Sequence, residues 1–438
     1  MSNLFPRLRT TVPGPRSLSL ATELRRWESP NITYVSPEFP VFWERAEGCL
    51  VTDVDGNVFL DLSAGFGAAA VGHSNPRVVA AIREQAGRLV HGMGDVHPPA
   101  VKVELQRTLA RLAPGNLSQC ILCTSGAESV EAALKTAMLA TGRAGVVAFE
   151  GAYHGLTYGA LALSGRSDFR APFQPQLGRF VCRAPYPRNT AEAATALELL
   201  DRWLCQPPDG LPPIGAVVVE PIQGRGGVVV PPHGWFAQLK TLCGRHGALL
   251  IADEIFTGFG RTGAWFASEV PPDVLCIGKA MGGGFPIAAC LATPEVMAAW
   301  GESTGEALHT STFLGNPLGC AASLAAIAEI EERGLVARVD ALGRWVHPRL
   351  EALRAACPAI AAVRGRGLMW GLELRNAAGI PDGAAARRAV LEALRRGVIL
   401  LPAGPSGNVL ELVPPYVITE EQLDFALSVL AEACGGTL

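Results

Sequence analysis

Short apolar runs alternate with helical segments from about residue 75 to residue 333. Each run is continuous and is bounded by turn residues, as expected for a strand that is buried on both faces of a sheet. Such an alternation of strands and helices predicts an α/β fold with a mostly parallel sheet that is covered on both sides. The runs lie at residues 120–124, 146–149, 216–219, 248–252 and 273–277.

The regions on either side show other patterns. Pro13, Pro15 and Pro30 disfavour a long helix within residues 1–35. Residues 42–65 alternate apolar and polar positions around Asp55-Gly56-Asn57, which predicts a β-hairpin. After about residue 334 the order is helix, strand, helix, two strands and helix, which predicts a smaller α+β domain. We therefore expect an N-terminal segment with part of the small domain at residues 1–74, a large domain at 75–333 and the C-terminal small domain at 334–438.

Composition excludes several classes of function. The net charge of −3 and the absence of a long run of like charges give no indication of nucleic-acid binding. No stretch of 18 apolar residues is present, so we expect no membrane span, and the N-terminus lacks the apolar core of a secretory signal. The eleven scattered cysteines suggest free thiols in the cytoplasm, and the lone pair Cys120 and Cys123 is expected to pack in the core and to bind no metal.

Two chemically active residues follow apolar runs. Asp253 comes directly after residues 248–252, and Lys279 follows residues 273–277 and precedes a run of three glycines. Ligands of open α/β sheets bind just beyond the carboxyl ends of the strands. An acid and a lysine in this place suit pyridoxal phosphate (PLP), because the lysine can bond the cofactor and the acid can keep its pyridine nitrogen protonated. Taken singly, such an Asp is more often a helix cap and such a Lys more often lies in a solvated turn.

Other strand ends carry further candidates. Ser125 and Glu128 predict a capping box at a helix start, and the same exposed amides can bind a phosphate group. Tyr153 follows another strand and could stack on a planar ring, although a tyrosine alone is more often a core residue. Glu220 ends a third strand, and Gln223 and Arg225 lie in the loop beyond it.

Six motifs occur in an order that matches a known family. They are SGAESVEAALK, YHG, EPIQGRGG, ADEIFTGFGRTG, IGKAMGGGFP and STFLGNP. With them the chain resembles the class III (omega) aminotransferases, PLP-dependent enzymes of fold type I, over nearly its whole length after residue 35. The resemblance implies a mostly parallel seven-stranded sheet in the large domain and a small α+β domain built from both termini. It also implies ping-pong transfer of an amino group from an amine to a 2-oxo acid.

The resemblance implies roles for single residues. Lys279 matches the lysine that bonds the cofactor and moves a proton, and Asp253 matches the partner of the pyridine nitrogen. The other cofactor-binding positions are Ser125, Gly126 and Ala127 at the phosphate, Tyr153 and Ile255 on the two ring faces, and Gln223 near the phenolic oxygen. Thr312 resembles the threonine that reaches the phosphate in the neighbouring subunit, so a homodimer with active sites at its interface is expected.

One position departs from the family. Many members have an arginine shortly before the C-terminal PP element, where it binds a substrate carboxylate and pairs with the acid that corresponds to Glu220. This chain has Glu411 there, so Glu220 would face a second acid, unless Glu411 points to solvent or the alignment is shifted by a residue. We expect a cationic amine substrate without a carboxylate, such as an aminoglycoside of antibiotic biosynthesis, another aminosugar or a polyamine. Arg225 is a candidate for binding the 2-oxo acid.

Two alternatives remain open at this point. The first is an aminotransferase of the diamino-acid or 4-aminobutyrate type, against which the missing arginine counts. The second is an aminomutase or epimerase on the same scaffold, which would use the same lysine without net exchange of the amine.

Overall fold

The computed structural model describes residues 5–436, and a seven-stranded sheet forms its centre. The strand order is β4-β10-β9-β8-β7-β5-β6. Strand β10 runs antiparallel to both of its neighbours, and the other pairs are parallel. This confirms the mostly parallel sheet. The strands are β4 (Gln119–Cys123), β5 (Gly145–Phe149), β6 (Val181–Ala184), β7 (Ile214–Val219), β8 (Leu249–Asp253), β9 (Val274–Ile277) and β10 (Ala288–Ala292).

Helices cover both faces of this sheet. Along β7, Val217 and Val219 belong to one apolar cluster, whereas Ala216 and Val218 belong to another, and all four are buried. Successive side chains of a strand point to opposite faces of the sheet, so all four residues can be buried only if each face is covered. The helices of this part are α2 (Pro76–Arg88), α3 (Ala100–Leu112), α4 (Gly126–Thr141), α5 (Tyr158–Leu163), α6 (Ser167–Arg170), η1 (Ala171–Gln176), α7 (Thr190–Cys205), α8 (Trp235–Arg245), η2 (Lys279–Gly282), α9 (Pro294–Met297), η3 (Ala298–Trp300) and α10 (Pro317–Glu332).

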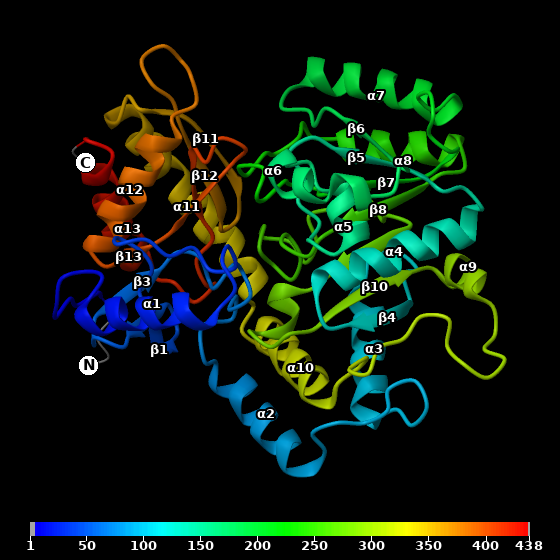
Figure 1. Cartoon of the computed structure of the whole chain (residues 1–438), viewed down its shortest axis with the longest axis horizontal. Helices are drawn as coiled ribbons and strands as arrows, with labels where there is room; N and C mark the ends of the chain where they lie inside the picture. Colours follow the sequence, from blue (N-terminus) through cyan, green and yellow to red (C-terminus); the bar gives the residue numbers. More distant parts are fainter. Residues whose placement is uncertain (1–4, 437–438) are drawn as a thin grey trace.

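The two ends of the chain join in a second, smaller body, which lies to one side in Figure 1. The strands β1 (Trp43–Glu47), β2 (Leu50–Asp53) and β3 (Val58–Asp61) form antiparallel pairs, and β13 (Val398–Ile399) pairs with β3 in parallel. A four-stranded antiparallel sheet has the order β11-β12-β15-β14. Its strands are β11 (Ile360–Arg366), β12 (Met369–Leu374), β15 (Val409–Leu412) and β14 (Leu401–Ala403), and the helices are α1 (Pro15–Trp27), α11 (Leu335–Ala356), α12 (Gly383–Arg395) and α13 (Glu420–Ala433).

Local sequence signals explain several element boundaries, and three of them act differently from expectation. The first 35 residues contain a 13-residue helix, α1, because Pro15 occupies its first turn, where a proline costs no hydrogen bond. The run VILLP at residues 398–402, which the sequence predicts as one strand, divides between β13 and β14, which belong to different sheets. At α4, Ser125 accepts from the Glu128 N–H, but Glu128 accepts from the backbone of Thr124, so the capping box is shifted by one residue.

No helix among residues 5–436 has both the length and the apolar composition that crossing a bilayer requires.

Candidate active site

A cavity of about 300 Å³ lies beyond the carboxyl ends of β5, β7 and β8. Four other residues, His154, Gly155, Leu156 and Phe256, line it together with part of the predicted set. The predicted residues on its wall are Gly126, Ala127, Tyr153, Glu220, Arg225, Asp253, Ile255 and Lys279. The parallel strand order therefore brings together residues that lie more than a hundred positions apart.

Asp253, at the end of β8, is held by two hydrogen bonds. Its Oδ2 lies 2.7 Å from Nδ1 of His154, and its Oδ1 accepts from the backbone N–H of Ile255 at 3.1 Å. Asp253 and His154 are both buried. Burial lowers the pKa of His154, but the hydrogen bond and charge of Asp253, together with Glu220, outweigh it and raise this pKa above its ordinary value of 6.5. The carboxylate is thus fixed in one orientation.

Lys279 follows β9 with a left-handed backbone, at φ +46°. Its Nζ lies 3.9 Å from the centre of the Phe256 ring. Burial lowers the pKa of this amine, while Asp253, Glu411 and Glu220 raise it, and the net shift is downward. A lysine with a lowered pKa has a larger neutral fraction, and the neutral amine is the form that reacts as a nucleophile or accepts a proton.

The glycine-rich segment of residues 65–72 packs on this lysine. A Cβ at Gly67 would lie 2.6 Å from the Phe256 ring and 3.7 Å from Cδ of Lys279. The backbone of Gly67 also has φ +81°, which favours glycine. The hairpin of β2 and β3 therefore delivers a segment without side-chain bulk to the lysine.

The N-terminus of α4 forms a second wall of the cavity. Gly126 and Ala127 face it, and a Cβ at Gly126 would come within 2.8 Å of Ile255. Helix N-termini present free N–H groups and a partial positive charge, which attract anions. Ser125 caps the helix through Glu128 N–H at 3.3 Å and does not line the cavity.

Glu220 is buried at the end of β7, and both of its oxygens accept hydrogen bonds. Oε1 accepts from the backbone N–H of Tyr153 at 2.9 Å, and Oε2 accepts from that of Gly224 at 3.0 Å. Burial raises the pKa of Glu220 to about 7, with Asp253 acting in the same direction, although His154 and the two N–H groups oppose this. Arg225, on the same cavity wall, is partly buried.

Glu411 lies on β15, between β12 and β14, and is also buried. Its Oε1 has no hydrogen-bond partner among residues 5–436. Burial raises the pKa of Glu411, and the charges that lower it come from Arg225, Lys279 and Arg261. The sequence predicts that Glu411 faces Glu220, whereas the charges that shift the pKa of Glu411 in the structure are those of these three cations.

Four predicted residues do not line the cavity, namely Ser125, Glu411, Gln223 and Thr312. Gln223 is buried, and its amide donates to the carbonyl of Glu150 at 2.8 Å, which fixes the loop after β5. Thr312 is exposed in the segment before α10.

The chain matches known proteins along most of its length. The sequence model of the family "Aminotransferase class-III" matches residues 33–434. The chain is a class III aminotransferase. It is 40% identical to acetylornithine aminotransferase of Methanopyrus kandleri over 399 residues, which cover 90% of this chain and 94% of the relative.

Two further comparisons support this family assignment. The 4-aminobutyrate aminotransferase of Mycobacterium leprae is 36% identical over 452 residues, covering 98% of both chains. The structure of an amine transaminase from an uncultivated Pseudomonas species, in its PLP-bound form, aligns with a TM-score of 0.84 at 29% identity, covering 93% of this chain and 98% of that one. The protein is therefore a PLP-dependent aminotransferase of fold type I.

The residues of this aminotransferase fit PLP. The cavity joins an amine, a fixed carboxylate and a helix N-terminus, which are the three groups that an aldehyde, a pyridine nitrogen and a phosphate require. The space near the helix depends on missing side chains, because a Cβ at Gly155 would lie 2.7 Å from Cβ of Ala127. Among the described residues, no group of three or more His, Cys, Asp or Glu is placed to bind a metal ion.

The sequence did not predict two residues of this site as functional. His154 was visible only as a polar residue directly after Tyr153, and its partner Asp253 is 99 positions away. Phe256 lies three residues after Asp253 in an ordinary turn, and only the fold shows that its ring contacts Lys279.

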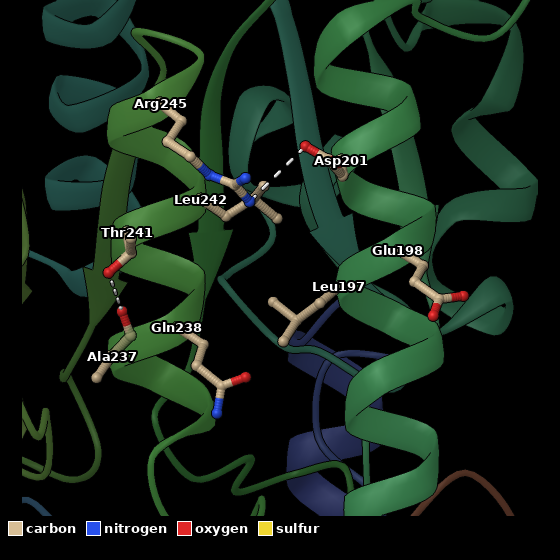
Figure 2. A pocket seen from close by; sticks show the side chains of 8 residues that line it. All are labelled: Leu197, Glu198, Asp201, Ala237, Gln238, Thr241, Leu242 and Arg245. Carbon is tan, nitrogen blue, oxygen red and sulfur yellow. Dashed lines mark hydrogen bonds and ion pairs between the residues drawn. The ribbon is translucent and has the colours of Figure 1, made fainter.

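A larger cavity, of about 450 Å³, has no relation to this chemistry. It is a groove between α7 and α8, where Asp201 and Arg245 form an ion pair at 3.9 Å (Figure 2). Both helices lie on the outside of the sheet, and none of the predicted site residues lines the groove.

Proposed function

We propose that this aminotransferase takes the amino group from a cationic primary amine without a nearby carboxylate and passes it to a 2-oxo acid in a ping-pong reaction. Aminoglycosides, other aminosugars and polyamines are donors of this kind. The observation that carries the proposal is Glu411, a buried acid with an oxygen that lacks a partner among residues 5–436. A second ammonium group on the donor would supply that partner, whereas a donor carboxylate beside Glu411 would be repelled.

The residues around the cavity would have different roles in the reaction. Bound PLP supplies an electron-accepting ring that stabilises the carbanion formed at the substrate carbon. Lys279 Nζ would take the proton from the carbon that carries the amino group and return one later in the reaction. Asp253, oriented by His154, would hold the proton on the pyridine nitrogen. Tyr153 and Ile255 would cover the two ring faces, Gln223 would fix the neighbouring loop, and the turn of Ser125, Gly126 and Ala127 would bind the phosphate.

Arg225 would bind the carboxylate of the 2-oxo acid in the second half of the reaction. It lies on the cavity wall together with Lys279 and Glu220, and its charge acts on Glu411. A planar guanidinium binds a carboxylate through two parallel hydrogen bonds. This arrangement would let one cavity serve a cationic donor and an anionic acceptor in turn.

A second candidate is an aminotransferase for diamino acids or 4-aminobutyrate. The names of the relatives favour it, because acetylornithine and 4-aminobutyrate both carry a carboxylate. In that case Arg225 would have to bind the carboxylate of donor and acceptor alike.

A half-reaction separates the two candidates. The PLP-loaded enzyme, without acceptor, is mixed in turn with an aminoglycoside, a polyamine, ornithine and 4-aminobutyrate, and the visible absorbance of the bound cofactor is followed. We expect absorbance loss with the first two only, and Glu411→Gln should slow these about tenfold while a neutral monoamine reacts as before. Reaction with 4-aminobutyrate, or equal losses for charged and neutral amines, would contradict the proposal.

We also propose a homodimer with active sites at its interface. The segments 89–96 and 308–316 are joined by an edge-to-face contact of His91 with Phe313, at 5.5 Å between ring centres. Together they expose several large apolar side chains, namely Leu89, Val90, Met93, Val96, Leu308 and Phe313. Such a patch is typical of a subunit interface. Thr312 lies within it, where it could reach a neighbouring subunit.

Sedimentation tests the dimer directly. We expect twice the mass of the chain for the wild type and a smaller species for Phe313→Asp. A wild-type monomer with full activity would contradict both the dimer and the role of Thr312.

The boundaries near residues 74 and 333 are proposed as domain limits, since α10 and α11 are separated there by Gly334 with φ +59°. Eleven free cysteines support a reducing compartment such as the cytoplasm.

A further inference from the structure

Three arginines line a cavity of about 280 Å³ at the edge of the large sheet. Arg170 ends α6, Arg179 lies in the loop after η1, and Arg183 is on β6, the last strand of the sheet. These arginines come from consecutive pieces of one segment that folds back on the edge strand. No residue of the active-site cavity belongs to this wall.

The three guanidinium groups lack acidic partners. Among residues 5–436, none of them forms an ion pair, and Arg183 donates a side-chain hydrogen bond to the carbonyl of Ala162. The Nε atoms of Arg170 and Arg183 are buried and have no partner at all in this part of the chain. Asp209, also on the cavity wall, makes no ion pair with them. By contrast, the neighbouring Arg166 is paired with Asp168 at 2.5 Å.

The buried guanidinium N–H groups without acceptors destabilise the folded protein. A buried donor without an acceptor keeps the cost of its lost hydration. Burial and the nearby charge of Arg170 also lower the pKa of Arg183 to about 10. An anion in the cavity would reduce the repulsion between these guanidinium groups and accept hydrogen bonds from them.

We propose that this cavity binds a phosphate group, either as inorganic phosphate or as part of a small phosphorylated metabolite. Guanidinium groups favour phosphate because their parallel N–H groups match two of its oxygens. The phosphate of PLP has its own place at the N-terminus of α4, so this second anion site is distinct from the cofactor site. It does not depend on the substrate proposed above.

Phe169 connects the site to the cofactor cavity. Phe169 directly precedes Arg170, and its ring meets that of Tyr153 edge to face, with 6.0 Å between the ring centres. An anion bound at Arg170 would therefore hold the segment that supports Tyr153.

Calorimetric titration of the PLP-loaded enzyme with inorganic phosphate tests the proposal, because the cofactor already fills the other phosphate site. We expect one phosphate per chain. Arg179→Gln, at an exposed residue, and Arg170→Gln should each weaken binding about tenfold, since each removes a charge-assisted hydrogen bond. Arg188→Gln, at an exposed arginine that follows β6 but lies outside the cavity, should bind as the wild type does.

Amide hydrogen exchange gives a second readout, which reports on the segment and not on the heat of binding. Phosphate should slow exchange in residues 167–179 of the wild type and should not do so in the Arg170→Gln and Arg179→Gln double variant. Tighter binding of a sugar phosphate than of inorganic phosphate would identify a phosphorylated metabolite as the ligand of this cavity. Tighter binding of inorganic phosphate would identify the free ion as the ligand. Absence of binding to the wild type, or equal binding to the double variant, would overturn the proposal whatever amine the enzyme uses.

Discussion

Nδ1 of His154 lies 2.7 Å from Oδ2 of Asp253, and these two buried residues line the cavity together with Lys279. The contact joins the loop after β5 to the end of β8. It restricts the rotation of Asp253, which we propose holds the proton on the pyridine nitrogen of PLP. His154 therefore acts as a positioning residue.

The first prediction concerns this contact. His154→Leu should lower kcat about tenfold to a hundredfold, because it removes a hydrogen bond to a charged group and leaves a buried acid without it. His154→Asn should recover much of the loss, because its amide can donate from nearly the same place as Nδ1. The measurement is steady-state transfer, together with cofactor content after gel filtration.

The pH dependence of stability gives a check on the same pair. The folded pKa of His154 is raised, so the stabilisation from its charged form is complete below about 6.5, the ordinary value, and is lost as pH rises through the higher folded value. The difference in unfolding free energy between wild type and His154→Leu should therefore shrink toward alkaline pH. A difference that grows with pH would contradict this account.

The second prediction concerns Lys279. Lys279→Ala should lower the transfer rate by about 10² to 10⁴, the usual contribution of a general acid and base. Lys279→Arg keeps the positive charge beside Phe256 but loses the titratable amine, and it should be similarly inactive. A Lys279→Ala enzyme that retained more than about a tenth of the rate would assign proton transfer to another group.

The sequence predicted five of the seven strands of the large sheet, namely β4, β5, β7, β8 and β9, because each leaves a local signal of continuous apolar residues. It did not locate β6, which contains Arg183, or β10. Eight residues of the cavity wall were predicted, some because parallel strands end at one edge and others, such as Ile255, from the resemblance to the family. It could not predict the bond between His154 and Asp253, whose partners are far apart in the chain. Similarly, Val398 gives no local sign that it pairs with Leu60 and not with β15. Helix α1 was missed because a proline at a first turn looks, in sequence, like a helix breaker.

The third prediction concerns the space at the helix N-terminus. Gly155 has φ +117°, and a Cβ there would lie 2.7 Å from Cβ of Ala127. Gly155→Ala should lower stability by about 1–3 kcal/mol and weaken PLP binding, because it strains the backbone and displaces the phosphate turn. Gly142→Ala is the matched control: its φ is +65°, and no atom lies within 4 Å of the added Cβ. It should cost about 1–2 kcal/mol and leave cofactor binding unchanged. Equal losses of cofactor in both variants would show that strain alone is responsible.

The last prediction follows from Glu220, whose pKa burial raises to about 7. Ionisation of this acid is easier in the unfolded chain, so the folded state loses stability as pH rises from about 4.5, the ordinary value, through about 7. A second ammonium group of the donor reverses this effect locally, because it favours the ionised carboxylate. Below about pH 7, binding of a diamine whose second ammonium group lies beside Glu220 should therefore release a proton from this acid.

The ratio of kcat/KM for a diamine to that for a monoamine isolates this effect, since ionisation of the reacting amine and of Lys279 affects both substrates. The ratio should rise by at most about tenfold per pH unit below pH 7 and become constant above it. In Glu220→Gln it should be low and independent of pH, because the amide keeps the shape of the side chain but cannot ionise. A ratio that is flat in the wild type would mean that the donor's second charge lies near Glu411 alone.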